Sequence, residues 1–263
     1  MITTADNCEF NFVSSKHDAW DAYVRQHPKG SIFHTAAMID VFQATRGLEP
    51  YAYAATDAEG KIVAMLVSCH VKTLNQFSAI SSRAVQFAEP LCDPDQVGVA
   101  ALTELIAMND QHMRSRALLC EVRSICEPGF EEDALAQCGY EHKDYINYVV
   151  NLDCDRDTLW RSVHKRQRQK IRSTHRKGIT IRDDNTEQGI ERLYSLLQAS
   201  YARAHVPLLD RQLFLLVTHN GQRRSWVGVR IDGKVTEQRR ELIAASRCGC
   251  HLNRPRHAAV QGL

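Results

Sequence analysis

The stretch YAYAATDAEGKIVAMLVSC, residues 51–69, carries the clearest fold signal in the first half of the chain. Residues 51–56 and 61–69 are rich in the aliphatic and aromatic side chains of β-strands, and residues 57–60, Asp-Ala-Glu-Gly, are typical of a turn. Two strand-like runs joined by a short turn predict an antiparallel β-hairpin. The other expected elements lie before and after this hairpin in the chain.

Amphipathic and apolar segments alternate on both sides of the hairpin. Apolar residues at helical spacing predict helices, short apolar runs predict strands, and Gly or Pro marks where a pattern stops. In the first half we expect helices over residues 18–26, 36–45, 96–113 and 130–138, and strands over 117–123 and 145–152. In the second half we expect helices over 157–177 and 187–204, a strand over 179–182, and a strand, turn and strand over 226–235.

Helices followed by a hairpin occur in the same order in both halves. This repetition predicts an α/β fold, of the α+β kind, built from two duplicated units. Each unit is expected to have a mixed, mostly antiparallel sheet with flanking helices. We place the first unit at residues 1–152 and the start of a second, incomplete unit at 153–235.

The pattern stops after Val235. A strand that has just left the turn Asp232-Gly233 should run for about five residues, but the chain continues through Arg, Glu and Gln and then mixes Cys, Arg, His and Pro without a period. We interpret residues 236–263 as an aberrant or disordered tail. A flexible terminus is one explanation. A truncated or frame-shifted gene product explains the abrupt change better, and we favour it.

The composition is that of an ordinary globular protein. The chain has 263 residues, 44% hydrophobic and 24% charged, which excludes wholesale disorder and corresponds to one or two domains. Its 33 Lys and Arg against 31 Asp and Glu leave a net charge of +2, which excludes a histone-like polycation but allows a local basic patch. The chain has neither a run of about 18 apolar residues nor a signal-peptide pattern at its start. We therefore expect a cytoplasmic protein.

The nine cysteines agree with that compartment, because their number is odd and no CxxC or framework spacing is present. Most are expected to be small buried hydrophobes. Cys248-Gly-Cys250, followed by His251, is the only close group. Because a second pair of zinc ligands is missing, we expect no metal site.

The strongest chemical signal is the run KRQRQKIRSTHRK, residues 165–177, which has seven Lys and Arg and no acid. Spacings of three and four place Lys165, Arg168 and Arg172 near one face of a helix, where they can hold several phosphates. A solvated basic face is the alternative. Like charges without a partner repel each other, which favours a phosphate-bearing partner such as a pyrophosphate, a nucleotide or an RNA backbone.

Motifs for nucleophilic catalysis and nucleotide binding are absent: the chain has no GxSxG, no P-loop and no GxGxxG. His164 and His175 flank the basic run and are candidate general bases, although we favour ordinary surface residues. Glu121 and Arg123 alternate along an expected strand and form either a buried ion pair or the lining of a cleft. The sequence assigns no catalytic residue.

Several of these segments resemble FemAB-like proteins in their order and spacing. The segment HPKGSIFH at residues 27–34, the hairpin, and Glu121-Val-Arg123 each resemble the first unit of that family. The basic run, closed by Gly178, is similar to the family's most characteristic stretch, and residues 194–214 resemble its helix and following loop. The similarity extends over residues 20–235.

This resemblance implies two GNAT-like units and the transfer of an acyl group to an amine. The implied donor is an aminoacyl-tRNA or an acyl-CoA, with no tightly bound cofactor, and the implied acceptor is a peptidoglycan or polysaccharide precursor of the cell envelope. The tRNA and peripheral association with a membrane are further expectations. Lys165, Arg168 and Arg172 inherit the family's contacts to the acceptor's phosphates, and Arg123 and Glu121 complete the expected substrate-binding set.

The implied mechanism is direct attack of the substrate amine on an activated carbonyl, with the protein supplying position, charge stabilisation and a proton route. Family members continue beyond the point where this pattern stops, so we expect this chain to be inactive as it stands. Two other hypotheses stay open. The chain is a nucleic-acid- or phosphate-binding module that uses the basic helix alone, or a pseudo-enzyme that pairs with a full-length paralogue.

Overall fold

The computed structural model contains the hairpin predicted from residues 51–69. Its strands are β2 (Leu48–Thr56) and β3 (Ile62–Val71), which pair antiparallel. Between them, the Asp57 carboxylate accepts the backbone N–H of Lys61 at 2.8 Å, and Gly60 has a φ of 81°, a value that favours glycine. Every residue of β3 is buried, so this strand lies inside the sheet and between two layers of helix.

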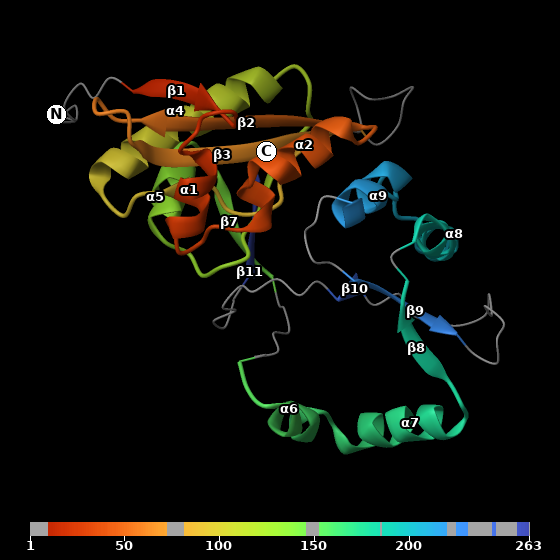
Figure 1. The fold of residues 1–263 in the computed structure, drawn as a ribbon. Helices are drawn as coiled ribbons and strands as arrows, with labels where there is room; N and C mark the ends of the chain where they lie inside the picture. The colour runs from red at the N-terminus through yellow and green to blue at the C-terminus, as the bar shows by residue number, and fades with distance from the viewer. Residues whose placement is uncertain are drawn as a thin grey trace. The chain divides into compact units, whose positions relative to one another are not determined.

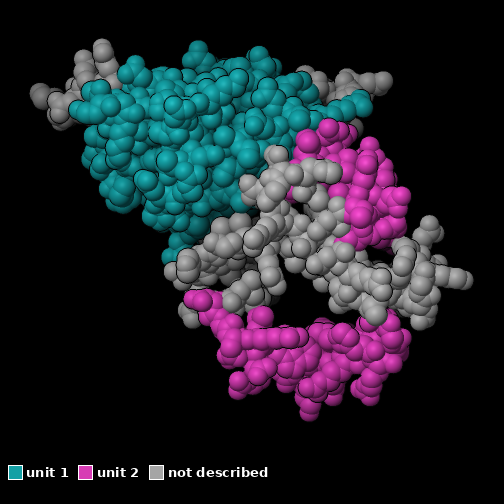
Figure 2. Space-filling view, viewed as in Figure 1, with its two compact units in different colours: residues 1–149, 253–263 teal, residues 150–252 magenta. Residues whose placement is uncertain are grey.

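The structure describes residues 10–72, 82–145, 153–184, 186–219, 225–230, 244–245 and 257–262. The chain divides into two compact units (Figure 2): unit 1 comprises residues 1–149 and 253–263, and unit 2 comprises residues 150–252. The boundary expected near residue 152 lies outside the described residues and stays a prediction.

Unit 1 is built on an eight-stranded sheet with the order β1-β2-β3-β4-β6-β11-β7, and β5 also pairs with β3 (Figure 1). Neighbouring strands are antiparallel, except that β4 and β6 are parallel. The remaining strands are β1 (Asn11–Ser14), β4 (Arg83–Gln86), β5 (Leu91–Cys92), β6 (Cys120–Arg123), β7 (Glu141–Tyr145) and β11 (His257–Gly262). The mixed, mostly antiparallel sheet predicted from the sequence is confirmed.

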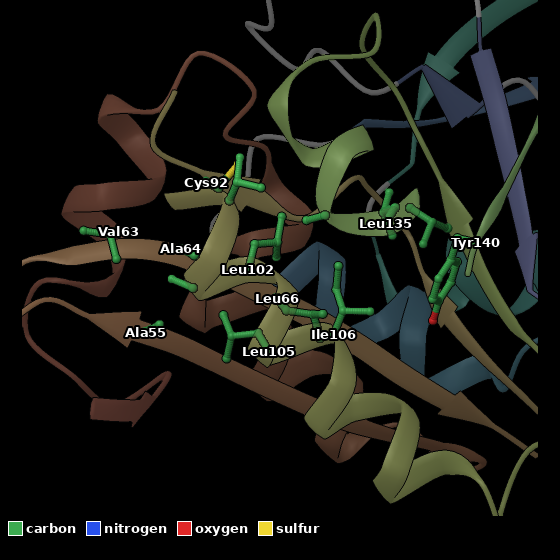
Figure 3. Close-up of a cluster of buried hydrophobic side chains, with 14 residues drawn as sticks. Ala55, Val63, Ala64, Leu66, Cys92, Leu102, Leu105, Ile106, Leu135 and Tyr140 are labelled. Atoms are coloured by element: carbon green, nitrogen blue, oxygen red, sulfur yellow. The ribbon is translucent and has the colours of Figure 1, made fainter. Parts of the chain in front are cut away.

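Helices cover both faces of this sheet because side chains along β3 alternate between the faces. Met65 and Val67 pack in one cluster with side chains of α1 (Trp20–Gln26) and α2 (Ala36–Ala44). Ala64 and Leu66 pack in a second cluster with side chains of two further helices (Figure 3). These are α4 (Gln96–Met113) and α5 (Phe130–Gln137). A short 3-10 helix, η1 (Ile32–His34), precedes α2.

Unit 2 contains four helices and a small antiparallel sheet with the order β10-β9-β8 among its described residues. The helices are α6 (Arg156–Ser162), α7 (Lys165–Arg176), α8 (Glu187–Ala204) and α9 (Arg211–His219). The strands are β8 (Thr180–Asp183), β9 (Ser225–Arg230) and β10 (Ala244–Ala245).

The single helix predicted over residues 157–177 is wrong, because the structure has two helices there. Val163 ends α6 with an extended backbone (ψ 129°), and His164 precedes α7 with ψ 139°. The His164 side chain accepts the backbone N–H of Arg166, so it acts as the N-cap of α7. A β-branched residue followed by a side chain that competes for backbone N–H groups interrupts the helix.

The strand expected over residues 145–152 differs from β7, which covers Glu141–Tyr145. Residues 146–152 lie outside the described residues. The segment EHKDY of β7 has no apolar alternation, and it lies at the end of the sheet order, where charged residues are common. Within the described part of the chain, no helix combines the length and apolar character needed to cross a membrane.

Most of residues 236–263 also lies outside the described residues, as do Lys234 and Val235 of the expected second hairpin. Two short segments of this stretch are described: β10 in the sheet of unit 2, and β11 between β6 and β7 in unit 1. The interpretation of residues 236–263 as an aberrant tail stays a prediction.

Candidate functional site

The parallel strands β4 and β6 of unit 1 end close to several charged and aromatic side chains. Their register pairs Val85 with Glu121 and Gln86 with Val122, after which the ladder stops. Beyond this point Glu89, which is 1% exposed, accepts the backbone N–H groups of Ile125 (2.8 Å) and Cys126 (3.0 Å) with its two carboxylate oxygens. The Glu89 carboxylate therefore accepts backbone N–H groups at the point where pairing between β4 and β6 ends. These two hydrogen bonds offset the cost of burying its polar oxygens.

Two histidines of the HPKGSIFH segment hold the connection between β4 and β5. The imidazole Nε2 of His27 lies 3.0 Å from the carbonyl oxygen of Cys92, and that of His34 lies 2.9 Å from the carbonyl oxygen of Glu89. A carbonyl oxygen only accepts, so Nε2 of His34 donates, while its Nδ1 accepts the N–H of Ser31 at 3.1 Å. These contacts make the two histidines structural.

Burial lowers the pKa of His34 to about 4, so this imidazole is neutral near pH 7. Glycine at position 30 of this segment has a steric reason. A Cβ on Gly30 would lie 1.8 Å from the carbonyl oxygen of Val24. The segment that carries the family resemblance in unit 1 thus fixes the backbone near the ends of β4 and β6.

Glu121 and Arg123 point to the same face of β6, and Arg83 of β4 joins them. Arg123 Nε donates to Glu121 Oε1 at 2.7 Å, and Arg83 Nη1 lies 3.5 Å from Glu121 Oε2. The Glu121 side chain is 13% exposed, whereas the arginine side chains are 42% and 43% exposed. One nearly buried carboxylate therefore positions two half-exposed guanidinium groups. Glu121 and Arg123 form an ion pair, but it is not the buried ion pair considered from the sequence, because Arg123 is half-exposed.

An aromatic group lies beside this charged cluster. The guanidinium carbon of Arg123 is 5.7 Å from the ring centroid of Phe87, within the range of a cation–π interaction. Phe87 in turn stacks on Phe42 (5.3 Å) and Phe33 (5.9 Å). The stack fixes Phe87 and with it one side of Arg123.

In unit 2, the basic helix α7 has no buried residue, and every residue from Lys165 to Gly178 is exposed except Arg168. The Arg168 Nη1 donates to three backbone carbonyl oxygens around the end of α6, those of Arg161 (2.7 Å), Val163 (2.8 Å) and Trp160 (3.3 Å). A cation at this position also complements the negative end of the α6 dipole. Arg168 thus holds α6 and α7 at their junction.

The other cations of α7 are placed differently from Arg168. The guanidinium of Arg172 lies over the ring of Trp160, with 5.9 Å between its carbon and the ring centroid. No ion pair within the described residues involves the remaining cations of this run. These are Lys165, Arg166, Lys170, Arg176 and Lys177.

The structure thus groups the predicted site residues into two sets. Glu121 and Arg123 lie together in unit 1, and Lys165, Arg168 and Arg172 lie along α7 in unit 2. Their role in binding substrate stays a prediction for every one of these residues. Of the two flanking histidines, His164 caps α7 and His175 lies exposed in its last turn.

Sequence reasoning missed Arg83, Phe87 and Glu89 on and just after β4. The segment RAVQFAEP, residues 83–90, has a strand-like apolar core, and a charge at each end of it was the available signal. The described residues contain no group of three or more metal-binding side chains, and Cys248, Cys250 and His251 lie outside them.

Comparisons with known proteins show only distant likeness. No protein-family model and no curated protein matches the chain. One similar solved structure is a GCN5-related glucosamine N-acetyltransferase region in a fungal multi-domain GH3 beta-N-acetylglucosaminidase, with 15% identity and a TM-score of 0.42. The match covers 84% of this chain and only 26% of that one.

A second similar structure is a tandem GNAT protein from the clavulanic acid biosynthesis pathway, without AcCoA. It has 12% identity and a TM-score of 0.45, over 85% of this chain and 70% of that one. Likeness at these values says nothing about substrate.

Proposed function

We propose that this chain is an acyltransferase that moves an acetyl or aminoacyl group onto an amine. The observation that carries the proposal is the pair of parallel strands β4 and β6 in an otherwise antiparallel sheet, with Phe87, Glu89 and Arg123 at their carboxyl ends. In sheets with parallel strands, ligands bind outside these ends. The order of segments that resembles FemAB-like proteins adds the reaction class.

The reaction needs little covalent chemistry from the protein. The amine nitrogen attacks the acyl carbonyl of a thioester or ester, the new C–N bond forms, and the bond to the thiolate or ribose oxygen breaks. The proton of the amine leaves to a base or to water. Positioning of the two substrates and stabilisation of the developing oxyanion account for rate enhancement in such a reaction.

Around the ends of β4 and β6 this chain offers one held guanidinium group and a fixed stretch of backbone. Arg123 is held by Glu121 and Phe87, and it keeps part of its guanidinium exposed to solvent. Glu89 fixes the backbone of residues 125 and 126. We assign Arg123 to an anionic group of a substrate, and Glu89 to positioning of the backbone rather than to contact with substrate.

The identity of the acceptor and of the donor is proposed from the resemblance to FemAB-like proteins. The acceptor is then the amine of a peptidoglycan or polysaccharide precursor, and the donor an acyl-CoA or an aminoacyl-tRNA. Lys165 and Arg172 would hold phosphates of the acceptor, whereas Arg168 already uses its Nη1 within the α6–α7 pair.

Mass spectrometry of reaction mixtures tests the proposal. The purified chain is mixed with acetyl-CoA or charged tRNA and a panel of amines that includes amino sugars and nucleotide-linked cell-wall precursors. We expect an N-acylated product with at least one pair. If a chain shown to be folded by circular dichroism acylates none of these amines, the acyltransferase proposal fails.

The variant Glu89→Gln tests the positioning role. The amide nitrogen of glutamine cannot accept an N–H, so one buried backbone donor loses its partner, at a cost of about 1–3 kcal/mol in unfolding free energy. We expect kcat to fall by about tenfold or more. Glu104→Gln is the matched control, because Glu104 is an exposed carboxylate of α4. Equal rates in both variants would remove Glu89 from the site.

A further inference from the structure

The basic helix α7 carries its cations in two stripes that run along the helix. Successive residues turn by about 100°, so Arg166, Lys170 and Lys177 lie within about 40° of one another, and Lys165, Arg172 and Arg176 form a second stripe about 120° away. Gln169 and Ser173 lie between the stripes.

The opposite side of α7 is occupied by Gln167, Ile171, Thr174 and His175, so it has a single apolar side chain. A helix that lies on a membrane needs a broad apolar face opposite its cations. The composition of α7 therefore favours a partner in water rather than an anionic bilayer.

Charge placement on α7 works against the stability of the isolated helix. Lys165 and Arg166 stand in its first turn, next to the positive end of the helix dipole, and no acid within residues 165–177 compensates them. Cations four residues apart also repel each other. Both effects are relieved when a ligand with several negative charges binds along the helix.

The number and spacing of the cations indicate the size of that ligand. The 12 residues of α7 span about 18 Å at about 1.5 Å per residue. Each strand of a duplex carries one phosphate per about 3.4 Å of axis. A single strand that keeps this stacked rise therefore presents about five phosphates over this length, and a duplex about twice as many. Apart from Arg168, the run 165–177 has six cations. A pyrophosphate would leave most of them without a counter-charge.

We propose that α7 binds the phosphate backbone of a single-stranded nucleic acid, with Arg166, Lys170 and Lys177 as one line of contacts and Lys165, Arg172 and Arg176 as the other. Arg168 is a positioning residue, since its bonds to the carbonyl oxygens at the end of α6 set the direction in which α7 leaves α6 (Figure 1). This inference uses α7 alone. It gives Lys165 and Arg172 a nucleic-acid backbone as ligand in place of the acceptor's phosphates, and it does not depend on the acyl-transfer step.

Fluorescence anisotropy with the full chain and a labelled 12-nucleotide oligouridine RNA tests the inference. Contacts to about five phosphates predict a slope of log K against log salt of about −3.5, because each contact contributes about −0.7 for single strands. Affinity should then fall by about a hundredfold between 50 and 200 mM KCl. A slope between zero and −1 would overturn the inference.

The triple variant Arg166→Ala, Lys170→Ala, Lys177→Ala should lose affinity at least tenfold and reduce the slope by about 2. Its matched control is Arg25→Ala, Arg46→Ala, Arg114→Ala, which removes three exposed cations of unit 1 and changes the net charge equally. Equal losses in the two variants would show general attraction of charge and overturn the inference.

Arg168→Lys separates positioning from phosphate contact. Lysine keeps the charge but lacks the planar guanidinium that reaches the carbonyl oxygens at the junction. We expect weaker RNA binding with an unchanged salt slope, and binding equal to the original chain would remove Arg168 from this role. Displacement of the RNA by pyrophosphate at the same phosphate concentration, or equally tight binding to vesicles with 30% anionic lipid, would overturn the choice of partner.

Discussion

Helices α4 of unit 1 and α8 of unit 2 both have 18 residues, yet they differ in how much of their surface is buried. Eight residues of α4 are buried, including Leu102, Leu105 and Ile106, which pack on the sheet. Only three residues of α8 are buried. Helices of equal length and similar apolar spacing therefore bury different numbers of residues. Among the described residues, α4 packs on an eight-stranded sheet, whereas unit 2 has a sheet of three short strands.

The same contrast holds for the units as a whole. Unit 1 has two hydrophobic clusters, one on each face of its sheet, and a network of buried polar contacts around Glu89 and His34. In unit 2, every residue of the basic helix α7 except Arg168 is exposed. Among the described residues, large buried clusters are therefore a property of unit 1, whereas the main charged feature of unit 2 is exposed.

Thiol reactivity should show the largest difference between the units. Burial raises the pKa of both Cys69 and Cys92 to about 12, while Cys154 of unit 2 is exposed. Raising the pKa from 9.0 to about 12 lowers the thiolate fraction of Cys69 and Cys92 about a thousandfold, so iodoacetamide at pH 8 should alkylate the exposed Cys154 much faster than either. Peptide mass spectrometry over time measures the rates. Similar rates in the native chain, as expected only in denaturant, would contradict the burial of unit 1.

Truncation of a buried leucine should show the second largest difference between the units, in the unfolding free energy that is lost. Leu102→Ala removes a fully buried side chain of α4 and should cost about 2–5 kcal/mol in unfolding free energy. Leu193→Ala is the matched change in α8, where fewer neighbours are lost, and should cost about 1–2 kcal/mol. Urea titration of each variant gives the two values. A larger cost for Leu193 than for Leu102 would reverse the comparison.

Acid should weaken unit 1 through His34. Burial lowers the pKa of His34 in the folded chain to about 4, below its ordinary value of 6.5. Between these values the unfolded chain binds the proton and the folded chain does not, so stability falls as pH drops from about 6.5 to 4, by about 3 kcal/mol in total.

Urea titrations at pH 4.5 and pH 7 measure this dependence, and His34→Gln is the variant to compare. Glutamine can still donate to the carbonyl oxygen of Glu89 but does not titrate in this range. We expect lower stability at pH 7 and a flatter pH dependence. An equally steep loss on acidification in the variant would assign the effect to other groups.

Local signals in the sequence were enough for many elements. The hairpin was predictable because its turn residues and apolar runs are contiguous, and the predicted ranges 96–113 and 187–204 coincide with α4 and α8. The break at Val163 and His164 was missed because helical spacing continues across it. β7 was missed because a charged edge strand has no apolar alternation.

The candidate site was only partly predictable. Glu121 and Arg123 are two residues apart on a strand, so their ion pair follows from local spacing. Arg83 and Glu89 meet β6 and the segment after it only because β4 and β6 are parallel neighbours, although more than 30 residues separate them in the chain. No local pattern carries that information.

Local patterns in the sequence predicted the hairpin, the helices α1, α2, α4, α5 and α8, the mixed sheet and the uncompensated charge of residues 165–177. Backbone preference, apolar period and formal charge act over a few residues, so they are legible without the fold. No local pattern predicts that Glu89 bonds to residues 125 and 126, or that Arg168 bonds to the end of α6 while its neighbours on α7 stay exposed. A side chain's partners depend on which backbone groups the packed chain leaves unpaired, and that is settled only when distant segments come together.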